Sequence, residues 1–227
     1  MNLYETDPEF MERFEYFAFQ ETVNEDGQHL PDETRFMAIL AALMGCQGID
    51  EFKIMLLKAL DAGLSAISVK EIVYQAVDYL GIGRVQPFLT ATNEALIERN
   101  VKLPLPGQAT TILENRLEKG VEVQTEIFGS GMKEAWKNGH INRWLASNCF
   151  GDYYTRTGLD LAQREMITFC FLMAQGGCEP QLTAHARGNM NLGNDKAFLI
   201  RVVSQCLPYI GYPRSLNAIA CINKAVE

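Results

Sequence analysis

The chain has 227 residues, of which 48% are hydrophobic, and its 28 acidic and 20 basic side chains give a formal net charge of -8. No basic run interrupts that balance, which argues against a nucleic acid partner, because phosphates are bound by clustered cations. No apolar run approaches the roughly 18 residues that cross a bilayer, and residues 1–20 are acidic and aromatic, unlike a secretory signal. We therefore expect a cytoplasmic protein with no membrane partner, whose six scattered cysteines, without a CxxC motif, are reduced.

The first two predicted helices carry aromatic and apolar side chains. Asp7 followed by Pro8 is a favourable helix start, because an acidic side chain can cap free amides and proline has no amide hydrogen to leave unpaired. After a loop at residues 24–31, Asp32 begins a second helix. Its body, MAILAALMG, is apolar nearly all round, which predicts a helix in the core.

Three more helices complete the first half of the chain. One covers about residues 51–62 and ends at Gly63, a natural C-cap. The next follows Ser68 and Glu71, whose spacing is that of a capping box, and the last covers about residues 86–98. No alternation of period two flanked by hairpin turns competes with these patterns, so the sequence predicts an all-α fold.

A connector at residues 99–107, RNVKLPLPG, separates the two halves. We place the boundary between an N-terminal unit, 1–100, and a C-terminal unit, 101–227. Helices are expected at about 109–128 and 131–146 and, after the segment 149–160, at about 161–175, 181–192, 195–210 and 213–225. Pro213 fits the first position of the last helix, whereas Pro208 should disturb the final turn of the preceding one.

The two halves repeat one another. Four residues recur at a spacing of 129, namely Arg35, Met37, Leu43 and Met44 as Arg164, Met166, Leu172 and Met173. Six recur at a spacing of 130, namely Gly63, Gln75, Tyr79, Gly81, Arg84 and Asn93 as Gly193, Gln205, Tyr209, Gly211, Arg214 and Asn223. The chain is therefore predicted to be a tandem duplication with a one-residue slip in a connecting loop.

The copies differ where acid–base chemistry would take place. The second copy carries Glu165 and His185, whereas the first has Phe36 and, near the slip, Met55 or Leu56. A carboxylate near a helix start is also explained by the helix dipole, and a histidine on an apolar face by core packing. Partial burial, however, moves a histidine pKa away from about 6.5 and makes the ring useful as an acid or base. We predict one site, in the second copy.

Cys178 is the best candidate for a rival thiol chemistry. It follows two glycines at the start of the His185 helix, where the helix dipole would lower its pKa. Cys46 lies in a comparable loop of the first copy, although off the repeat spacing.

Arg187 and Arg214 are candidate anchors for a substrate carboxylate, which arginine binds bidentately, although structural ion pairs also explain them. The sequence has no metal, phosphate-loop or dinucleotide motif, so no cofactor and no metal are expected.

Residues 150–193 and the following PYIGYPRSLNA resemble the carboxymuconolactone decarboxylase family. The specific features are RE after GLDL, a histidine with Gly193 eight residues later, and YxGYPRxxNA. The first copy, from PDETRFMAILAALMG to YLGIGRVQP, is similar to the same family more loosely. The resemblance implies an all-α fold with paired helical hairpins, assembled into rings, commonly trimers or hexamers.

The family includes cofactor-free lactone decarboxylases and alkylhydroperoxidase D-like proteins that use a CxxC with a nearby glutamate and histidine. By the resemblance, Glu165 and His185 are the acid–base residues, whereas the CxxC does not carry over. Our leading hypothesis is a decarboxylase acting on a small carboxylated lactone or related acid. The alternatives are a peroxiredoxin-like thiol protein that uses Cys178 with His185 as its base, and a non-catalytic oligomeric binding protein.

Overall fold

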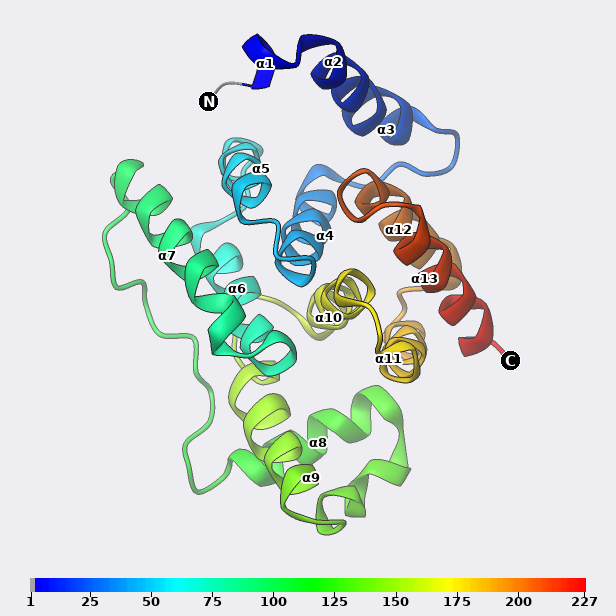
Figure 1. Cartoon of the computed structure of the whole chain (residues 1–227). Coiled ribbons are helices and arrows are strands. Elements are labelled where there is room, and N and C mark those ends of the chain that lie inside the picture. Colours follow the sequence, from blue (N-terminus) through cyan, green and yellow to red (C-terminus); the bar gives the residue numbers. More distant parts are fainter. Residues whose placement is uncertain (1–2) are drawn as a thin grey trace.

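A computed structural model describes residues 3–227 as an arrangement of helices, with no strand in that range (Figure 1). The first copy comprises α1 Leu3–Thr6, α2 Pro8–Tyr16, the π-helix η1 Phe17–Glu21, α3 Thr22–Asn24, α4 Asp32–Gly45, α5 Ile49–Asp61, α6 Ala66–Leu80 and α7 Ile82–Glu98. The rest comprises α8 Arg116–Phe128, the 3-10 helix η2 Ser130–Lys137, α9 His140–Trp144, the π-helix η3 Leu145–Tyr154, α10 Leu161–Gln175, α11 Glu179–Asn191, α12 Lys196–Ile210 and α13 Tyr212–Ala225. The all-α prediction is confirmed.

The helices α4 and α10 form the centre of the molecule and pack against each other (Figure 1). In each, every residue over eleven positions is buried, 35–45 in α4 and 164–174 in α10, and these two ranges are 129 residues apart. The contact is close because Gly45 has no side chain, and a Cβ there would come 2.6 Å from the Phe171 carbonyl oxygen. One continuous core therefore contains residues of both copies.

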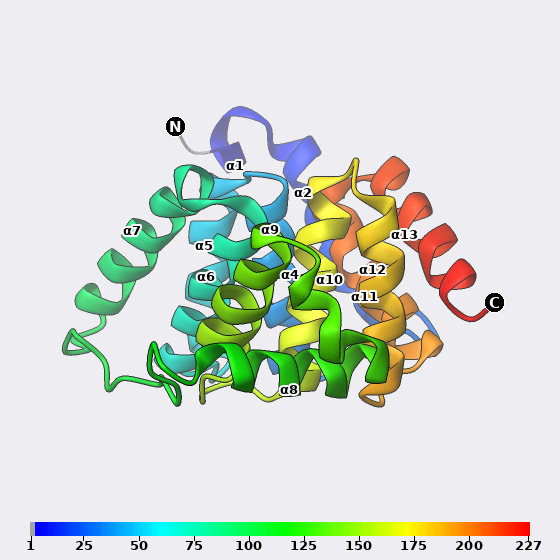
Figure 2. The same cartoon turned by 90° about the horizontal axis from the view of Figure 1, so that it is seen from below.

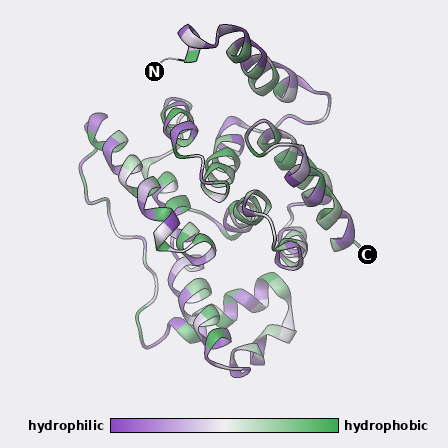
Figure 3. Ribbon diagram, viewed as in Figure 1, coloured by the Kyte–Doolittle hydropathy of each residue, from purple (hydrophilic) through white to green (hydrophobic). Residues whose placement is uncertain are grey.

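The outer helices carry one apolar face. α7 and α13 show both hydrophobic and hydrophilic residues along their length, as expected of helices that cover a core (Figure 3). No helix among residues 3–227 combines the length and the apolar character that a bilayer span requires.

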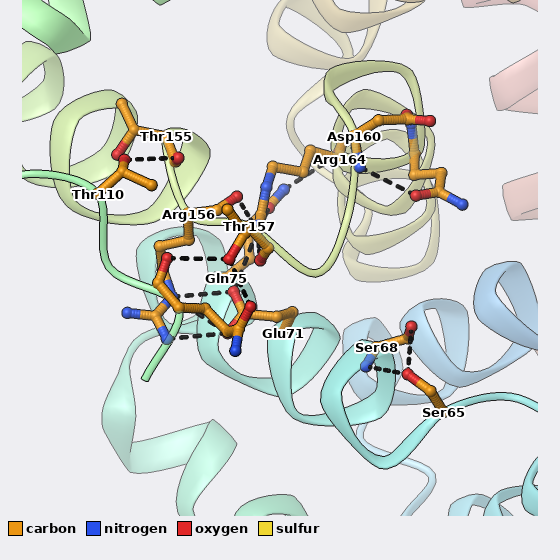
Figure 4. Close-up of polar contacts among 12 residues, drawn as sticks. Ser65, Ser68, Glu71, Gln75, Thr110, Thr155, Arg156, Thr157, Asp160 and Arg164 are labelled. Atoms are coloured by element: carbon orange, nitrogen blue, oxygen red, sulfur yellow. Dashed lines mark hydrogen bonds and ion pairs between the residues drawn. The ribbon is translucent and has the colours of Figure 1, made fainter. Parts of the chain in front are cut away.

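Arginine and glutamine side chains join the copies at equivalent places. Arg164 Nη1 donates to Gln75 Oε1 at 2.8 Å, and Arg35 Nε donates to Gln205 Oε1 at 3.0 Å. Arg164 also donates to Glu71, whose carboxylate is 1% exposed and receives a second arginine, Arg156 (Figure 4). The repeated arginine and glutamine residues thus form two equivalent contacts between the copies. Only the contact of Arg164 is extended by a buried ion cluster.

The ends of several helices differ from the sequence predictions. α6 begins at Ala66 because the Ser65 side chain accepts a hydrogen bond from the Ser68 amide, so the expected capping box at Ser68 and Glu71 is wrong. Glu71 instead pairs with arginines from the second half. The helices α10 to α13 agree with their predicted ranges to within two residues, and α12 continues through Pro208 to Ile210.

The segment between the copies is less regular than predicted. The helix expected at about 109–128 begins only at Arg116, and the range 131–146 holds parts of three short helices. α8 packs along η3, because Gly120 and Gly151 lack side chains at the crossing, where a Cβ would overlap the backbone of the other helix. α8 contacts α11, and η3 contacts α6; α8 runs along one edge of the molecule (Figure 2). α8 and η3 bring Phe128 and Tyr154 to the residues described next.

Candidate acid–base site

Glu165 and His185 meet inside the second copy. The His185 Nδ1 atom lies 2.8 Å from Glu165 Oε2. Glu165 projects from α10 and is fully buried, while His185, on α11, is 9% exposed. Asn189 holds the two helices together at this point, because its amide nitrogen donates both to the Glu165 carbonyl at 2.9 Å and to the His185 carbonyl at 2.8 Å. The two residues that the sequence analysis assigned to one site are thus in hydrogen-bond contact.

A chain of hydrogen bonds fixes the protons around Glu165. Arginine has only donors, so the Gln75 oxygen must accept from Arg164, and the Gln75 amide nitrogen donates to Thr168 Oγ1 at 2.8 Å. The Tyr154 hydroxyl donates to Glu165 Oε1 at 2.7 Å. Since its single proton is used there, the Tyr154 oxygen accepts the hydrogen bond of 2.7 Å that joins it to Thr168 Oγ1.

The same argument assigns the two nitrogens of His185. As a carboxylate, Glu165 accepts a proton donor at each oxygen, so Nδ1 of His185 carries a hydrogen. Within residues 3–227 the other nitrogen, Nε2, forms no hydrogen bond. Nε2 is therefore the atom that can exchange a proton with a bound molecule, while the carboxylate stabilises the ring when it is charged.

Aromatic rings and a glycine surround the pair. The rings of Phe128 and Tyr79 meet the imidazole edge to face, with centroids 5.3 and 5.7 Å away. Gly188 lies against Glu165 and Phe128, since a Cβ there would come 2.8 Å from Glu165 Oε2 and 2.9 Å from Phe128 Cε1. The site is thus packed on its inner side and leaves room for no larger residue at position 188.

A second group of polar side chains lies behind Tyr154. The Tyr79 and Tyr154 hydroxyl oxygens are 2.9 Å apart, and the Cys149 thiol donates to Tyr79 at 3.6 Å. Burial raises the pKa of both phenols and of this thiol well above their ordinary values, so all three are neutral. Asp78 interacts with Cys149, and burial raises the pKa of its carboxyl to about 7.

Cys178 lies apart from the acid–base pair. It precedes α11 and is seven residues before His185, about 10 Å along a helix axis. Its thiol donates to the Leu172 carbonyl at 3.4 Å, just as the Cys46 thiol donates to the Leu43 carbonyl at 3.6 Å in the first copy. Burial raises the pKa of the Cys178 thiol instead of lowering it, which opposes the predicted activation. Both cysteines act as caps of equivalent helix ends.

The two candidate arginines lie in different places. Arg187 is exposed on α11 and donates to the Ala225 carbonyl at 3.0 Å. With Phe128 it lines an open cavity of about 280 Å³, one side of which is the ring that packs on His185. Arg214 instead lies beside Gly176 and lines a much smaller cavity with Cys178. Arg187, unlike Arg214, is therefore linked to the acid–base pair through a shared neighbour, Phe128.

The equivalent place in the first copy has no acid–base pair. Phe36 stands where the second copy has Glu165, and Met55 stands at the position of His185. The Tyr209 hydroxyl reaches Met55 Sδ at 3.5 Å, as Tyr79 reaches the His185 ring. Each repeated tyrosine therefore faces the site of the other copy.

Sequence reasoning missed three residues of the site, Tyr154, Tyr79 and Thr168. The recurrence of Tyr79 as Tyr209 marked it as a repeated residue. The spacing alone does not show that its side chain contacts a residue of the other copy. Thr168 lies three residues after Glu165, on the same helix face. Tyr154 lies within the stretch that resembles the family, but no motif in that stretch singled it out. Among residues 3–227 no group of three or more histidine, cysteine or acidic side chains is arranged to hold a metal ion.

Comparison with known proteins agrees with the sequence motifs. A sequence model described as the carboxymuconolactone decarboxylase family matches the chain twice, at residues 8–94 and 140–224. A protein named 4-carboxymuconolactone decarboxylase from Acinetobacter baylyi is 28% identical over 120 residues. That alignment covers 47% of this chain and 83% of the relative, so the relative is about as long as one copy. The predicted resemblance and the tandem arrangement are confirmed.

Proposed function

The chain belongs to the carboxymuconolactone decarboxylase family, and from this premise we propose that it is a cofactor-independent acid–base enzyme. Its substrate is a small carboxylated lactone or a related acid, and its reaction is decarboxylation. The observation that carries the proposal is the Glu165–His185 pair, because the contact through Nδ1 leaves Nε2 of the histidine without a hydrogen-bond partner among residues 3–227.

Decarboxylation of such an acid needs one proton. When the carboxylate leaves as carbon dioxide, the electron pair of the broken bond passes into the unsaturated ring, and a carbon atom takes up a proton. The charged ring of His185 gives that proton from Nε2, and Nδ1 keeps its hydrogen bond to Glu165. Tyr154 holds the other carboxylate oxygen and so keeps Glu165 in the plane that the imidazole requires.

Arg187 is the residue we assign to the substrate carboxylate. It is exposed and lines the cavity bounded by Phe128, the ring that packs on His185. This cavity is open, whereas a developing negative charge is stabilised best where water is excluded. We therefore also propose a homo-oligomer, a trimer or a hexamer, in which a second copy covers this face; light scattering at catalytic concentrations would measure its mass.

Turnover of 4-carboxymuconolactone, followed as carbon dioxide release, tests the assignment. We expect His185→Gln to lower kcat/KM by about 10²- to 10⁴-fold. The matched control is His140→Gln, since His140 is exposed and packs on Trp144. Full activity of the His185 variant would overturn the assignment. No turnover by the wild type, together with a rise in Tm on adding the lactone, would favour a binding protein instead.

A further inference from the structure

A cavity of about 790 Å³ is lined mainly by residues of the first copy. It lies between the N-terminal helices and α5 and is open on one side. Its walls are mainly apolar and aromatic, with side chains that include Phe10, Phe14, Ile54 and Met55. A volume of roughly 300–1,000 Å³ with such walls is the usual size and character of a small-molecule site.

The cavity occupies the place that corresponds to the acid–base site. Met55 is the counterpart of His185 and Tyr209 that of Tyr79, and both line the cavity. Lys58 lines it too and is the counterpart of Gly188, where no side chain fits in the second copy. The first copy has thus replaced the proton-transferring groups by a space with apolar walls.

The polar groups of the cavity are mostly acidic. Glu15, Asp50 and Glu51 line it, against the single cation of Lys58. The Lys58 ammonium already lies over the Phe19 ring, 4.8 Å from its centroid, so the aromatic wall does accept a cation. Burial raises the pKa of Glu51, and a second positive charge nearby would favour its ionised form.

We propose that this cavity is a second small-molecule site that takes a hydrophobic organic cation, such as an aryl or alkyl ammonium. The aromatic rings receive the apolar body and the face of the cationic group, and the three carboxylates balance its charge. The acidic lining disfavours a carboxylate, which is the group expected at the acid–base site. The proposal rests on the cavity alone and stands or falls separately from the decarboxylase function.

Methionine methyl resonances give a direct test. Of the nine methionines, Met11 and Met55 line the cavity, whereas Met166 and Met173 lie in the core of the second copy. With methyl-labelled full-length protein and benzyltrimethylammonium as probe, we expect saturable shifts of the Met11 and Met55 signals only. The signals are assigned with Met11→Leu and Met55→Leu. Shifts confined to other methionines, or none up to millimolar probe, would overturn the site.

Charge and shape variants test the ligand class. Glu51→Gln combined with Asp50→Asn should weaken binding of the probe at least about fivefold, and Met55→Trp, which fills the cavity, should abolish it. Asp61→Asn and Ile97→Trp are the matched controls, because both positions are exposed and outside the cavity. Benzyl alcohol or benzoate binding as tightly as the cation, or a cation affinity that the charge variant leaves unchanged, would contradict the proposal.

Discussion

Gln75 on α6 accepts a hydrogen bond from Arg164 on α10 at 2.8 Å, across the boundary between the two copies. The bond orients the glutamine amide, whose nitrogen donates to Thr168, and Thr168 contacts the Tyr154 hydroxyl that donates to Glu165. The equivalent contact of Arg35 with Gln205 has no such consequence, because the residue after the arginine is a phenylalanine there. A contact that is repeated between the copies therefore also belongs to the hydrogen-bond network of one site.

The buried ion cluster around Glu71 should be a main source of stability. In Glu71→Gln, two arginines lose their counter-charge, and one of them, Arg164, is fully buried. We expect the free energy of unfolding to fall by about 3 kcal/mol or more, measured by urea denaturation. Asp61→Asn removes an exposed partner of Arg99 and should cost less than about 1 kcal/mol. Similar losses in both variants would contradict the interpretation.

Gly188 should be intolerant of a side chain. In Gly188→Ala the new methyl group would push Glu165 Oε2 and Phe128 apart, both of which lie within 3 Å of it. We expect a loss of about 1–3 kcal/mol in stability and at least a tenfold lower kcat, because the carboxylate moves away from His185.

Gly83→Ala is the control for that variant. Gly83 lies in α7, and a Cβ there would meet no atom within 4 Å. Alanine favours a helix over glycine by about 1 kcal/mol, so this variant should be as stable as the wild type or more so, with unchanged turnover. If the Gly188→Ala protein were as stable and as active as the Gly83→Ala protein, the site would accommodate a methyl group without displacing the acid–base pair.

The repeat and the helices of the second copy were predictable because both rest on local patterns. Asp160 with Gln163 makes a capping box at the start of α10, and Asp195 caps α12, so caps and apolar periodicity agree there. The same local rule failed at Glu71. Its spacing from Ser68 imitates a capping box, but its partners, Arg156 and Arg164, are 85 and 93 residues away.

The candidate site was predicted only in part for the same reason. Glu165 and His185 were found because they belong to one helical pair and differ between copies. Tyr79 and Tyr154 come from α6 and η3 and are 75 residues apart in sequence, so only the packing of both copies brings their hydroxyls together. Cys178 had a favourable local setting, yet burial against the end of α10 outweighs the helix dipole.

Cys178 should be an unreactive thiol. Since burial raises its pKa above the ordinary value, little thiolate exists at neutral pH. We expect slow alkylation by iodoacetamide at pH 6 and a marked increase only above pH 9, followed by mass spectrometry of the modified peptide. Cys178→Ser should retain lactone turnover. Rapid modification at pH 6 would revive the thiol hypothesis, and the Cys46→Ser protein would show whether the reaction is specific to Cys178.

Asp78 should make stability depend on pH in an unusual direction. Burial raises its pKa from 3.8 to about 7, and Asp152 adds to this effect, so the folded protein holds a proton that the unfolded chain releases. The stabilisation from this group is therefore complete below about pH 4 and is lost as pH rises through about 7. The difference between the two pKa values corresponds to at most about 4 kcal/mol.

Asp78→Asn isolates this contribution, because asparagine resembles the protonated acid and cannot ionise. We expect the advantage in stability of the variant over the wild type in urea denaturation to be larger at pH 8.5 than at pH 5, because the wild type loses stability between the two pKa values. Asp61→Asn, on the surface, should leave the difference between the two pH values unchanged. If Asp78→Asn destabilised the protein more at pH 8.5 than at pH 5, the carboxylate would have to be the stabilising form, and the buried Oδ2 would need a partner that residues 3–227 do not provide.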